Sequence, residues 1–254
     1  MHDVDTEYGQ SKCRQLSRLD ESMGFRSAFN FVPERYAVSA ELRQYLVNRG
    51  FEVGVHGLKH DGKLFLSRGK WHHNAFRINQ YLREWNSVGF VSPSTHRKLD
   101  RMHDLDIEYD ASTFDTDPFE PQPDGMTTIF PFWIQGNNGQ KGYVELPYTL
   151  PQDFTLFILM KQQNIDIWKR KLDWIVEKGG MVLLITHPDY MNFGNDHTRI
   201  EEYHLELYQE LLDYIKSKYE GQYWHALPWE MAQFWKRKMV EKNLDVHSKS
   251  GAGL

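Results

Sequence analysis

Segments with the period of a β-strand alternate along this chain with segments that have the spacing of a helix. Short apolar runs of strand length lie at residues 27–32, 51–56, 107–109, 143–146 and 181–187. Helical patterns lie between or after them, at residues 11–23, 39–48, 72–88, 165–176 and 200–215. Such an alternation favours a mostly parallel sheet, either an open doubly wound sheet or a (β/α) barrel. In both architectures, functional groups collect at the C-terminal ends of the strands.

The composition allows one full core and argues against some classes of partner. With 40% hydrophobic residues among 254, we expect a single domain at residues 1–240 and a disordered tail at 241–254. The net charge of −5, without a strongly basic stretch, argues against a nucleic-acid partner. No apolar run has the length of a membrane span and no signal peptide precedes the first motif, so we expect a cytoplasmic protein without a membrane partner. The oligomeric state is left open.

The stretch FEVGVHGLKHDG, residues 51–62, carries the first candidate site. Its apolar residues alternate, which predicts a half-buried strand that ends at His56. His60 follows four residues later, so a tight turn would bring two imidazoles to one point. Histidine pairs with this spacing are also common on solvated helix faces, and the pair alone is a weak metal signal.

Two further stretches carry groups that suit the same chemistry. Asp3 and Asp5 flank one valine, so on an extended segment their carboxylates lie on the same side. Two like charges this close are tolerated best beside a cation or a hydrogen-bond network, although a solvated N-terminus is the simpler explanation. Near the C-terminus, the apolar run LLIT ends in His187 and Pro188, which predicts another strand that ends in a histidine.

Together these three stretches resemble, in order and spacing, the motifs of the metal-dependent polysaccharide deacetylases with the NodB homology fold. The family has an aspartate pair after a strand, a histidine pair four residues apart, and a late strand that ends in a histidine. The resemblance implies an α/β fold, a distorted (β/α) barrel with about seven strands, formed by one catalytic domain. Only Met1 and His2 precede Asp3. We therefore expect a first strand that is very short or incomplete.

The resemblance also implies roles for the residues that match its motifs. Asp5, His56 and His60 would hold a divalent metal ion, for which zinc is the expected identity and nickel, cobalt or iron are alternatives. Asp3 would be the catalytic base that takes a proton from the attacking water. His187 would be the catalytic acid that protonates the leaving amine.

Two residues are candidates for contact with the substrate. The resemblance assigns the backbone N–H of Ser94, after Pro93, to the oxyanion. Trp133 lies near the end of a long irregular stretch at residues 112–142, which we expect to wall the substrate cleft. Its indole could stack on a sugar ring, although packing within the loop would explain it equally well.

The chain departs from the family pattern at two positions. The family pairs its catalytic aspartate with an arginine two residues before the motif proline, where this chain has Val91. Asp3 therefore lacks that partner unless Arg97 or another residue replaces it. The family also tunes its catalytic histidine with an aspartate and a tryptophan. In this chain the candidates are Asp115 or Asp117 for the aspartate and Trp133 for the tryptophan.

These observations predict a metal-dependent hydrolase that removes N-acetyl groups from a sugar or polysaccharide. One alternative is an amidohydrolase on the same fold that acts on a non-sugar amide or a cyclic imide. An open groove lined by aromatic residues would favour a glycan, whereas a closed small pocket would favour a metabolite. A further alternative is a carbohydrate-binding protein with impaired catalysis.

Overall fold

A computed structural model describes the chain except residues 118, 121, 123, 137–138, 195–199 and 251–254. Seven strands form one sheet in the order β1-β2-β3-β4-β5-β7-β6. The pairs are parallel apart from β6 with β7, which are antiparallel. The bounds are β1 His2–Val4, β2 Ala28–Phe31, β3 Glu52–His56, β4 Gly89–Val91, β5 Tyr109–Asp110, β6 Phe132–Ile134 and β7 Tyr143–Glu145.

Residues 183–186 close this sheet into a distorted barrel. On one side, the N–H of Asp3 donates to the carbonyl of Thr186 over 2.9 Å, and the N–H of Thr186 donates to the carbonyl of Met1. On the other side, the N–H of Thr149 donates to the carbonyl of Leu183 over 2.8 Å. The predicted strand at 181–187 is thus an extended segment with partners on both sides. The alternative of an open sheet is excluded.

The first strand is short, as expected, and it is in place. All three residues of β1 pair with β2, in the register His2 with Phe29 through Val4 with Phe31. Thr6 then caps the next helix by accepting a hydrogen bond from the N–H of Gly9. The two carboxylates of the N-terminal motif therefore lie at the C-terminal end of a parallel strand.

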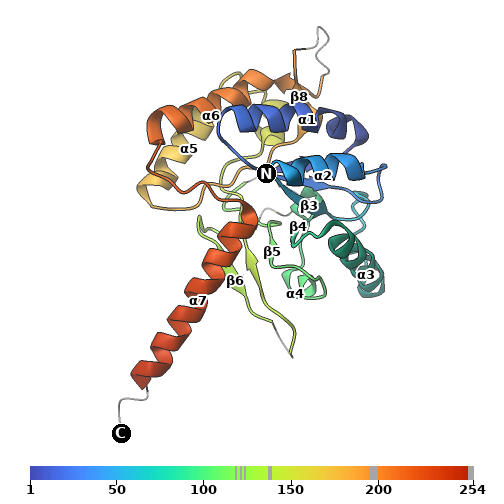
Figure 1. Ribbon diagram of the computed structural model, residues 1–254, viewed down its shortest axis with the longest axis vertical. Coiled ribbons are helices and arrows are strands. Elements are labelled where there is room, and N and C mark those ends of the chain that lie inside the picture. Colours follow the sequence, from blue (N-terminus) through green and yellow to red (C-terminus); the bar gives the residue numbers. More distant parts are fainter. Residues whose placement is uncertain (118, 121, 123, 137–138, 195–199, 251–254) are drawn as a thin grey trace.

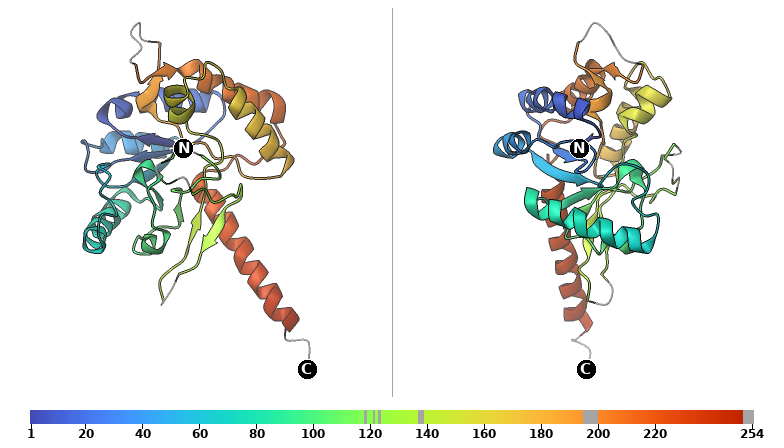
Figure 2. Two further views of the ribbon diagram at one scale, coloured as in Figure 1. Left: turned by 180° about the vertical axis from the view of Figure 1, so that it is seen from behind. Right: turned by 90° about the vertical axis from the view of Figure 1, so that its right-hand side faces the viewer.

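Helices surround the sheet, as Figures 1 and 2 show. Their bounds are α1 Glu7–Ser22, α2 Ala40–Asn48, α3 Arg68–Trp85, α4 Leu99–Met102, α5 Asp166–Glu177, α6 Leu205–Tyr219 and α7 Pro228–Ser250. Two short 3₁₀ turns are η1 Pro93–Thr95 and η3 Pro188–Tyr190, and η2 Phe154–Leu159 is a π-helix. The strand β8 Met191–Asn192 pairs with β9 Tyr203–His204. Large side chains such as Phe31, Trp71 and Trp168 are fully buried in the core between these layers.

The C-terminal helix α7 begins against the β6–β7 hairpin and then projects away from the rest of the molecule (Figure 1). It runs through residues 241–250, and residues 251–254 of the predicted tail lie outside the described part. The assignment of residues 1–240 to one domain stays a prediction. Within the described residues, no helix has the length and apolar character needed to cross a membrane.

Candidate active site

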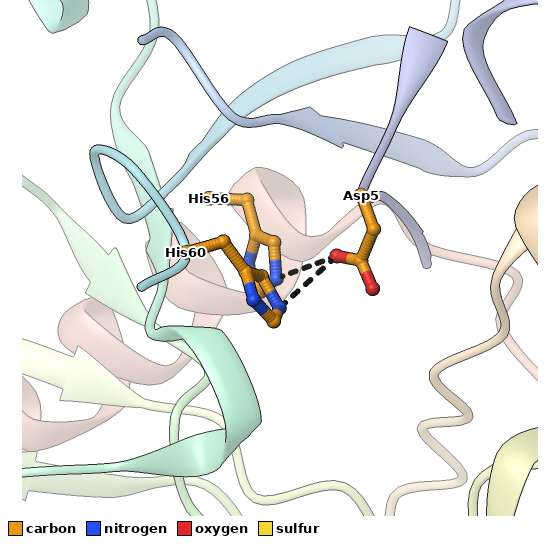
Figure 3. Close-up of side chains that lie close together, drawn as sticks. All are labelled: Asp5, His56 and His60. Carbon is orange, nitrogen blue, oxygen red and sulfur yellow. Dashed lines mark ion pairs between the residues drawn. The ribbon is translucent and has the colours of Figure 1, made fainter. Parts of the chain in front are cut away.

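Three side chains that follow or end the strands β1 and β3, on either side of β2, converge on one point (Figure 3). Asp5 follows β1, His56 ends β3, and His60 lies in the turn after β3. Asp5 Oδ1 lies 3.3 Å from Nε2 of His56 and 3.3 Å from Nε2 of His60. In a tetrahedral site with bonds of about 2.0–2.1 Å, neighbouring ligand atoms are about 3.3–3.4 Å apart. Both distances from Asp5 therefore match those between ligands of one small cation, and the three donor atoms all lie within 4.8 Å of one another.

The turn after β3 has the backbone that this convergence needs. Gly57 and His60 have φ of 63° and 52°, in the left-handed region, so the chain reverses sharply between the two histidines. A Cβ on Gly57 would also lie 2.4 Å from ring carbons of Pro93. Glycine is thus required at this position both by conformation and by space.

Protonation at this point also fits a bound cation. His56 Nδ1 lies 3.0 Å from the carbonyl of Val91, which can only accept, so Nδ1 carries a proton. This leaves the lone pair of Nε2 available to a cation that Asp5 also binds. Asp5 Oδ1 is buried and accepts no hydrogen bond from the described residues. Burial disfavours the charged forms of both His56 and Asp5. The negative charges of Asp3 and Asp5 nevertheless raise the pKa of His56, and the nearby histidines lower the pKa of Asp5. One carboxylate and two imidazoles suit a divalent transition metal, so the donor set fits the expected cofactor.

Asp3 is held beside these ligands by an asparagine. Its carboxylate is 3% exposed, and Oδ1 accepts a 2.7 Å hydrogen bond from Nδ2 of Asn30. Asp3 and Asn30 are register partners on β1 and β2, which explains why their side chains meet. The other oxygen, Oδ2, lies 3.7 Å from Nδ1 of His56. Arg97 does not replace the family arginine, because its guanidinium contacts Asp124 and the carbonyl of Thr95 instead.

Asn30 was missed by the sequence analysis, although the sequence carries a signal for it. It is the polar residue inside the otherwise apolar strand β2, and it is fully buried. The neighbouring strand makes room for it, since a Cβ on Gly54 would lie 2.0 Å from Oδ1 of Asn30.

His187 is oriented by Asp153, which the sequence analysis also missed. Nδ1 of His187 lies 2.7 Å from Asp153 Oδ1, and the N–H of His187 donates to Oδ2 over 2.7 Å. The hydroxyl of Tyr203 donates to the same Oδ2 over 3.0 Å. Burial opposes the imidazolium, but the charge of Asp153 outweighs it and raises the pKa of His187 to about 10. His187 therefore holds two protons at neutral pH.

Neither aspartate proposed as the partner of the catalytic histidine takes that place. Asp115 forms an ion pair with Lys171 over 2.6 Å, and Asp117 accepts a hydrogen bond from the hydroxyl of Tyr148 over 3.0 Å. The assignment to Asp115 or Asp117 is therefore wrong. Asp153 stands directly before an apolar run, where the sequence suggests only the start of an element.

Asp189 holds the loop that carries the predicted metal ligand. The N–H of Asp5 donates to Asp189 Oδ2 over 3.0 Å, and the hydroxyl of Thr6 donates to Oδ1 over 2.5 Å. Gly9 on α1 allows this approach, since a Cβ there would lie 2.1 Å from Oδ2 of Asp189. Burial and the charge of Asp5 raise the pKa of Asp189.

These groups surround one cavity of about 220 Å³. It is lined by Asp3, Asp5, His56, His60 and His187, together with Ser92, Ser94, Thr95, Phe119, Glu120, Gln152, Phe154, Thr155, Leu159, Ile185 and Tyr190. Ser94 has a left-handed backbone, with φ of 53°, at the rim of this cavity.

Trp133 is not among the described residues that line the cavity. It lies on β6 opposite Val144, and its indole N–H donates to the side chain of Gln135. The structure therefore places Trp133 outside this cavity, and its stacking on a substrate stays a prediction. Phe119, Phe154 and Tyr190 provide the aromatic walls, and the first of these does come from the irregular stretch predicted to wall the cleft.

Comparison with known proteins gives a structural likeness only. No protein-family profile and no curated protein matches the sequence. A structure from Mycobacterium smegmatis, described as a polysaccharide deacetylase, has 15% identity and a TM-score of 0.68, over 91% of this chain and 79% of that one.

Two further structures resemble the chain. An allantoinase has 18% identity and a TM-score of 0.64, over 90% of this chain and 74% of that one. A pseudoenzyme of the CE4 family from Bacillus anthracis has 14% identity and a TM-score of 0.51, over 91% and 63%. At these identities the likeness concerns the fold, and the chain has the distorted (β/α) barrel of the NodB-like polysaccharide deacetylases.

Proposed function

We propose that this chain is a metal-dependent amide hydrolase that removes N-acetyl groups from a sugar or glycan. The observation that carries the proposal is the convergence of Asp5, His56 and His60 at ligand spacing, in a cavity that Asp3 and His187 also line. The Mycobacterium smegmatis structure with this fold is described as a polysaccharide deacetylase, which supports the choice of reaction.

Asp3 would act as the base. When bound, a divalent cation supplies a Lewis acid that polarises the amide carbonyl and acidifies water. Asn30 holds Oδ1 of Asp3, which leaves Oδ2 as the oxygen able to take the proton from water that attacks the acyl carbon. The backbone N–H of Ser94 stays the candidate donor to the oxygen that becomes negative.

His187 would complete the reaction as the acid. Because Asp153 engages Nδ1, the proton on Nε2 is the one available to the leaving nitrogen. The amide C–N bond breaks as this proton transfers, and the acyl carbon keeps the water oxygen as acetate. Return of the proton from Asp3 to His187, directly or through solvent, restores both groups.

The decisive experiment combines metal content with acetate release from acetylated chito-oligosaccharides. We expect one equivalent of a transition metal in the wild type and its loss in both His56→Ala and His60→Ala, because each variant removes one of three ligands. Asp3→Asn should keep the metal and lose roughly a hundredfold or more in kcat, since it removes only the base.

His73→Ala is the matched control, because His73 is exposed on α3 away from the cavity, and it should keep both metal and activity. A wild type that binds no metal after reconstitution would show that the cluster is not a metal site.

A second candidate is the hydrolysis of a small cyclic amide or imide. The cavity volume of about 220 Å³ suits a small molecule, and an allantoinase shares the fold. Assaying allantoin beside the chito-oligosaccharides separates the two candidates, because each predicts turnover of only one of these substrates.

A third candidate is a binding protein with impaired catalysis, since a pseudoenzyme shares the fold. Two observations favour the enzyme instead. Asn30 engages the aspartate that Val91 leaves without an arginine, and β1 is fully paired. Metal-loaded protein that binds the oligosaccharides and releases no acetate would favour the binding protein.

A further inference from the structure

A second cavity adjoins the candidate active site. It has a volume of about 320 Å³ and lies between the turn after β3, the start of α3 and the loop after η1. His60 lines both this cavity and the one that holds the candidate ligands, and Pro93 lies beside Ser94 on the shared wall. A ligand that reaches the metal site from this side would therefore fill both spaces.

The lining of this second cavity, hereafter the basic cavity, has an excess of positive charge. Its lysines are Lys59, Lys70 and Lys98. Lys59 lies 3.6 Å from Glu34, but neither Lys70 nor Lys98 has an acidic partner within the part of the chain that the structure describes. Asp61 is the acidic residue that faces them from the lining.

Two other basic groups of the lining add little to this excess. The guanidinium of Arg97 is buried against Asp124, which offsets its charge. His96 is half-buried and lines the cavity beside it. The ammonium groups of Lys70 and Lys98 are thus the uncompensated charges.

The start of α3 points independently to an anion. Its first turn contains Arg68 and Lys70 and no acidic residue, although the N-terminus of a helix favours negative charge. Ser67 caps the helix through the N–H of Lys70. A bound anion beside this turn would relieve the repulsion between the lysine and the helix dipole.

The two adjoining cavities therefore differ in charge. In the active-site cavity the carboxylates of Asp3, Asp5 and Glu120 are offset by the imidazolium of His187 and would be offset further by the expected cation, whereas two lysines of the basic cavity are not offset by an ion pair within the described residues. A substrate that spans both needs an uncharged amide at one end and a negative group at the other.

We propose that the substrate is an acidic one, with a carboxylate or phosphate group next to the acetamido group that is removed, and that Lys70 and Lys98 bind this anion in the basic cavity. This inference rests on the proposed function and narrows its substrate class. It makes the enzyme selective for acidic over neutral glycans, with a preference that falls as salt screens the exposed lysines.

The test compares three substrates: chitopentaose, a 6-carboxylated chitopentaose and a 6-phosphorylated chitopentaose. We expect kcat/KM for acetate release to be roughly tenfold higher for an anionic oligomer than for the neutral one at low ionic strength, because two exposed ion pairs contribute modestly. The difference between the carboxylated and phosphorylated oligomers identifies the anion. The Lys70→Ala/Lys98→Ala double variant should lose this preference.

A control is Lys178→Ala/Lys216→Ala, which removes an exposed and a half-buried lysine that both lie outside the two cavities, and it should keep the preference. Equal preference in wild type and in the Lys70→Ala/Lys98→Ala variant would overturn the proposal.

Calorimetric binding of the same three oligomers to metal-loaded protein separates this proposal from the proposed function. Tighter binding of an anionic oligomer, lost in Lys70→Ala/Lys98→Ala, would support the basic cavity even if no acetate is released. Equal affinity for neutral and anionic oligomers would contradict it.

Discussion

At the scale of single residues, an amide holds the candidate base where the resemblance implies an arginine. Nδ2 of Asn30 donates to Asp3 over 2.7 Å, so it fixes the carboxylate without adding a positive charge. Orientation, rather than charge, is therefore what this partner contributes to Asp3.

This role predicts the effect of Asn30→Ala. Groups that orient a catalytic or ligating side chain typically contribute about 10- to 100-fold, so we expect kcat to fall by roughly that factor. KM and metal content should change little, because Asn30 does not reach the three ligands. Steady-state kinetics and elemental analysis measure both. The control is Asn79→Ala, which removes a side-chain amide that forms hydrogen bonds with the backbone of Asp104 and Asp106. Full activity in Asn30→Ala would contradict the assignment.

The contact between His187 and Asp153 predicts a change in pH dependence. Asp153 raises the pKa of His187 to about 10, so in the wild type the acid stays protonated up to about that pH. In Asp153→Asn the charge is gone and burial lowers the pKa. The alkaline limb of the kcat profile should therefore move to lower pH by at least about one unit. An unchanged limb would show that another group limits the rate at high pH.

At the scale of the elements, the neighbouring strands β5 and β7 carry a buried pair of carboxyl groups. Asp110 and Glu145 are register partners and both are fully buried. Burial raises the pKa of Asp110 to about 7, and burial together with the charge of Asp110 raises the pKa of Glu145 well above its usual value. Ser112 links the pair to the active site, since its hydroxyl donates to Asp110 and accepts from the N–H of Ser92.

This pair makes stability depend on pH. The pKa of Asp110 is higher in the folded chain than its usual 3.8, so its contribution to stability is present below that value and lost as the pH rises through about 7. The free energy of unfolding in urea should therefore fall across this range, and Asp110→Asn should flatten the slope. Asp106→Asn, at an exposed ion pair, should leave it unchanged. The same slope in Asp110→Asn would exclude this carboxyl group as its source.

The ends of these strands can be predicted from the sequence, because the apolar pattern that marks a strand involves only residues close together in the chain. The apolar alternation before His56 and the run before His187 both place a histidine at the end of an extended segment, as the structure has them. Asn30 and Asp153 could not be placed in this way. Their partners lie 27 and 34 residues away, and only the pairing of distant segments brings them together.

The position of Trp133 could not be predicted for a related reason, because composition does not say which way a loop folds. Its proline-rich surroundings suggested a cleft wall, but β6 returns along β7 and carries the indole to another part of the molecule. The residues of the same stretch that reach the cavity, Phe119 and Glu120, have no distinguishing spacing in the sequence.

At the scale of the whole molecule, the barrel brings residues 183–189 beside the start of the chain at the candidate site. Residues 183–186 lie beside β1, so the segment that carries His187 is bonded to the segment that carries Asp3 and Asp5. Asp189 adds a second link between these segments, since its carboxylate accepts a hydrogen bond from the N–H of Asp5, 184 positions away in the sequence.

This closure has a consequence for how the protein is made. Contacts across more than 180 positions form only after the intervening chain has been synthesised, and such contacts also slow folding. Until residues 183–186 have left the ribosome, β1 can pair only with β2, and the candidate base Asp3 and acid His187 are not brought together. The chain therefore acquires its catalytic groups as a set only when residue 187 has emerged, so a shortened translation product would contain the predicted metal ligands and lack the acid.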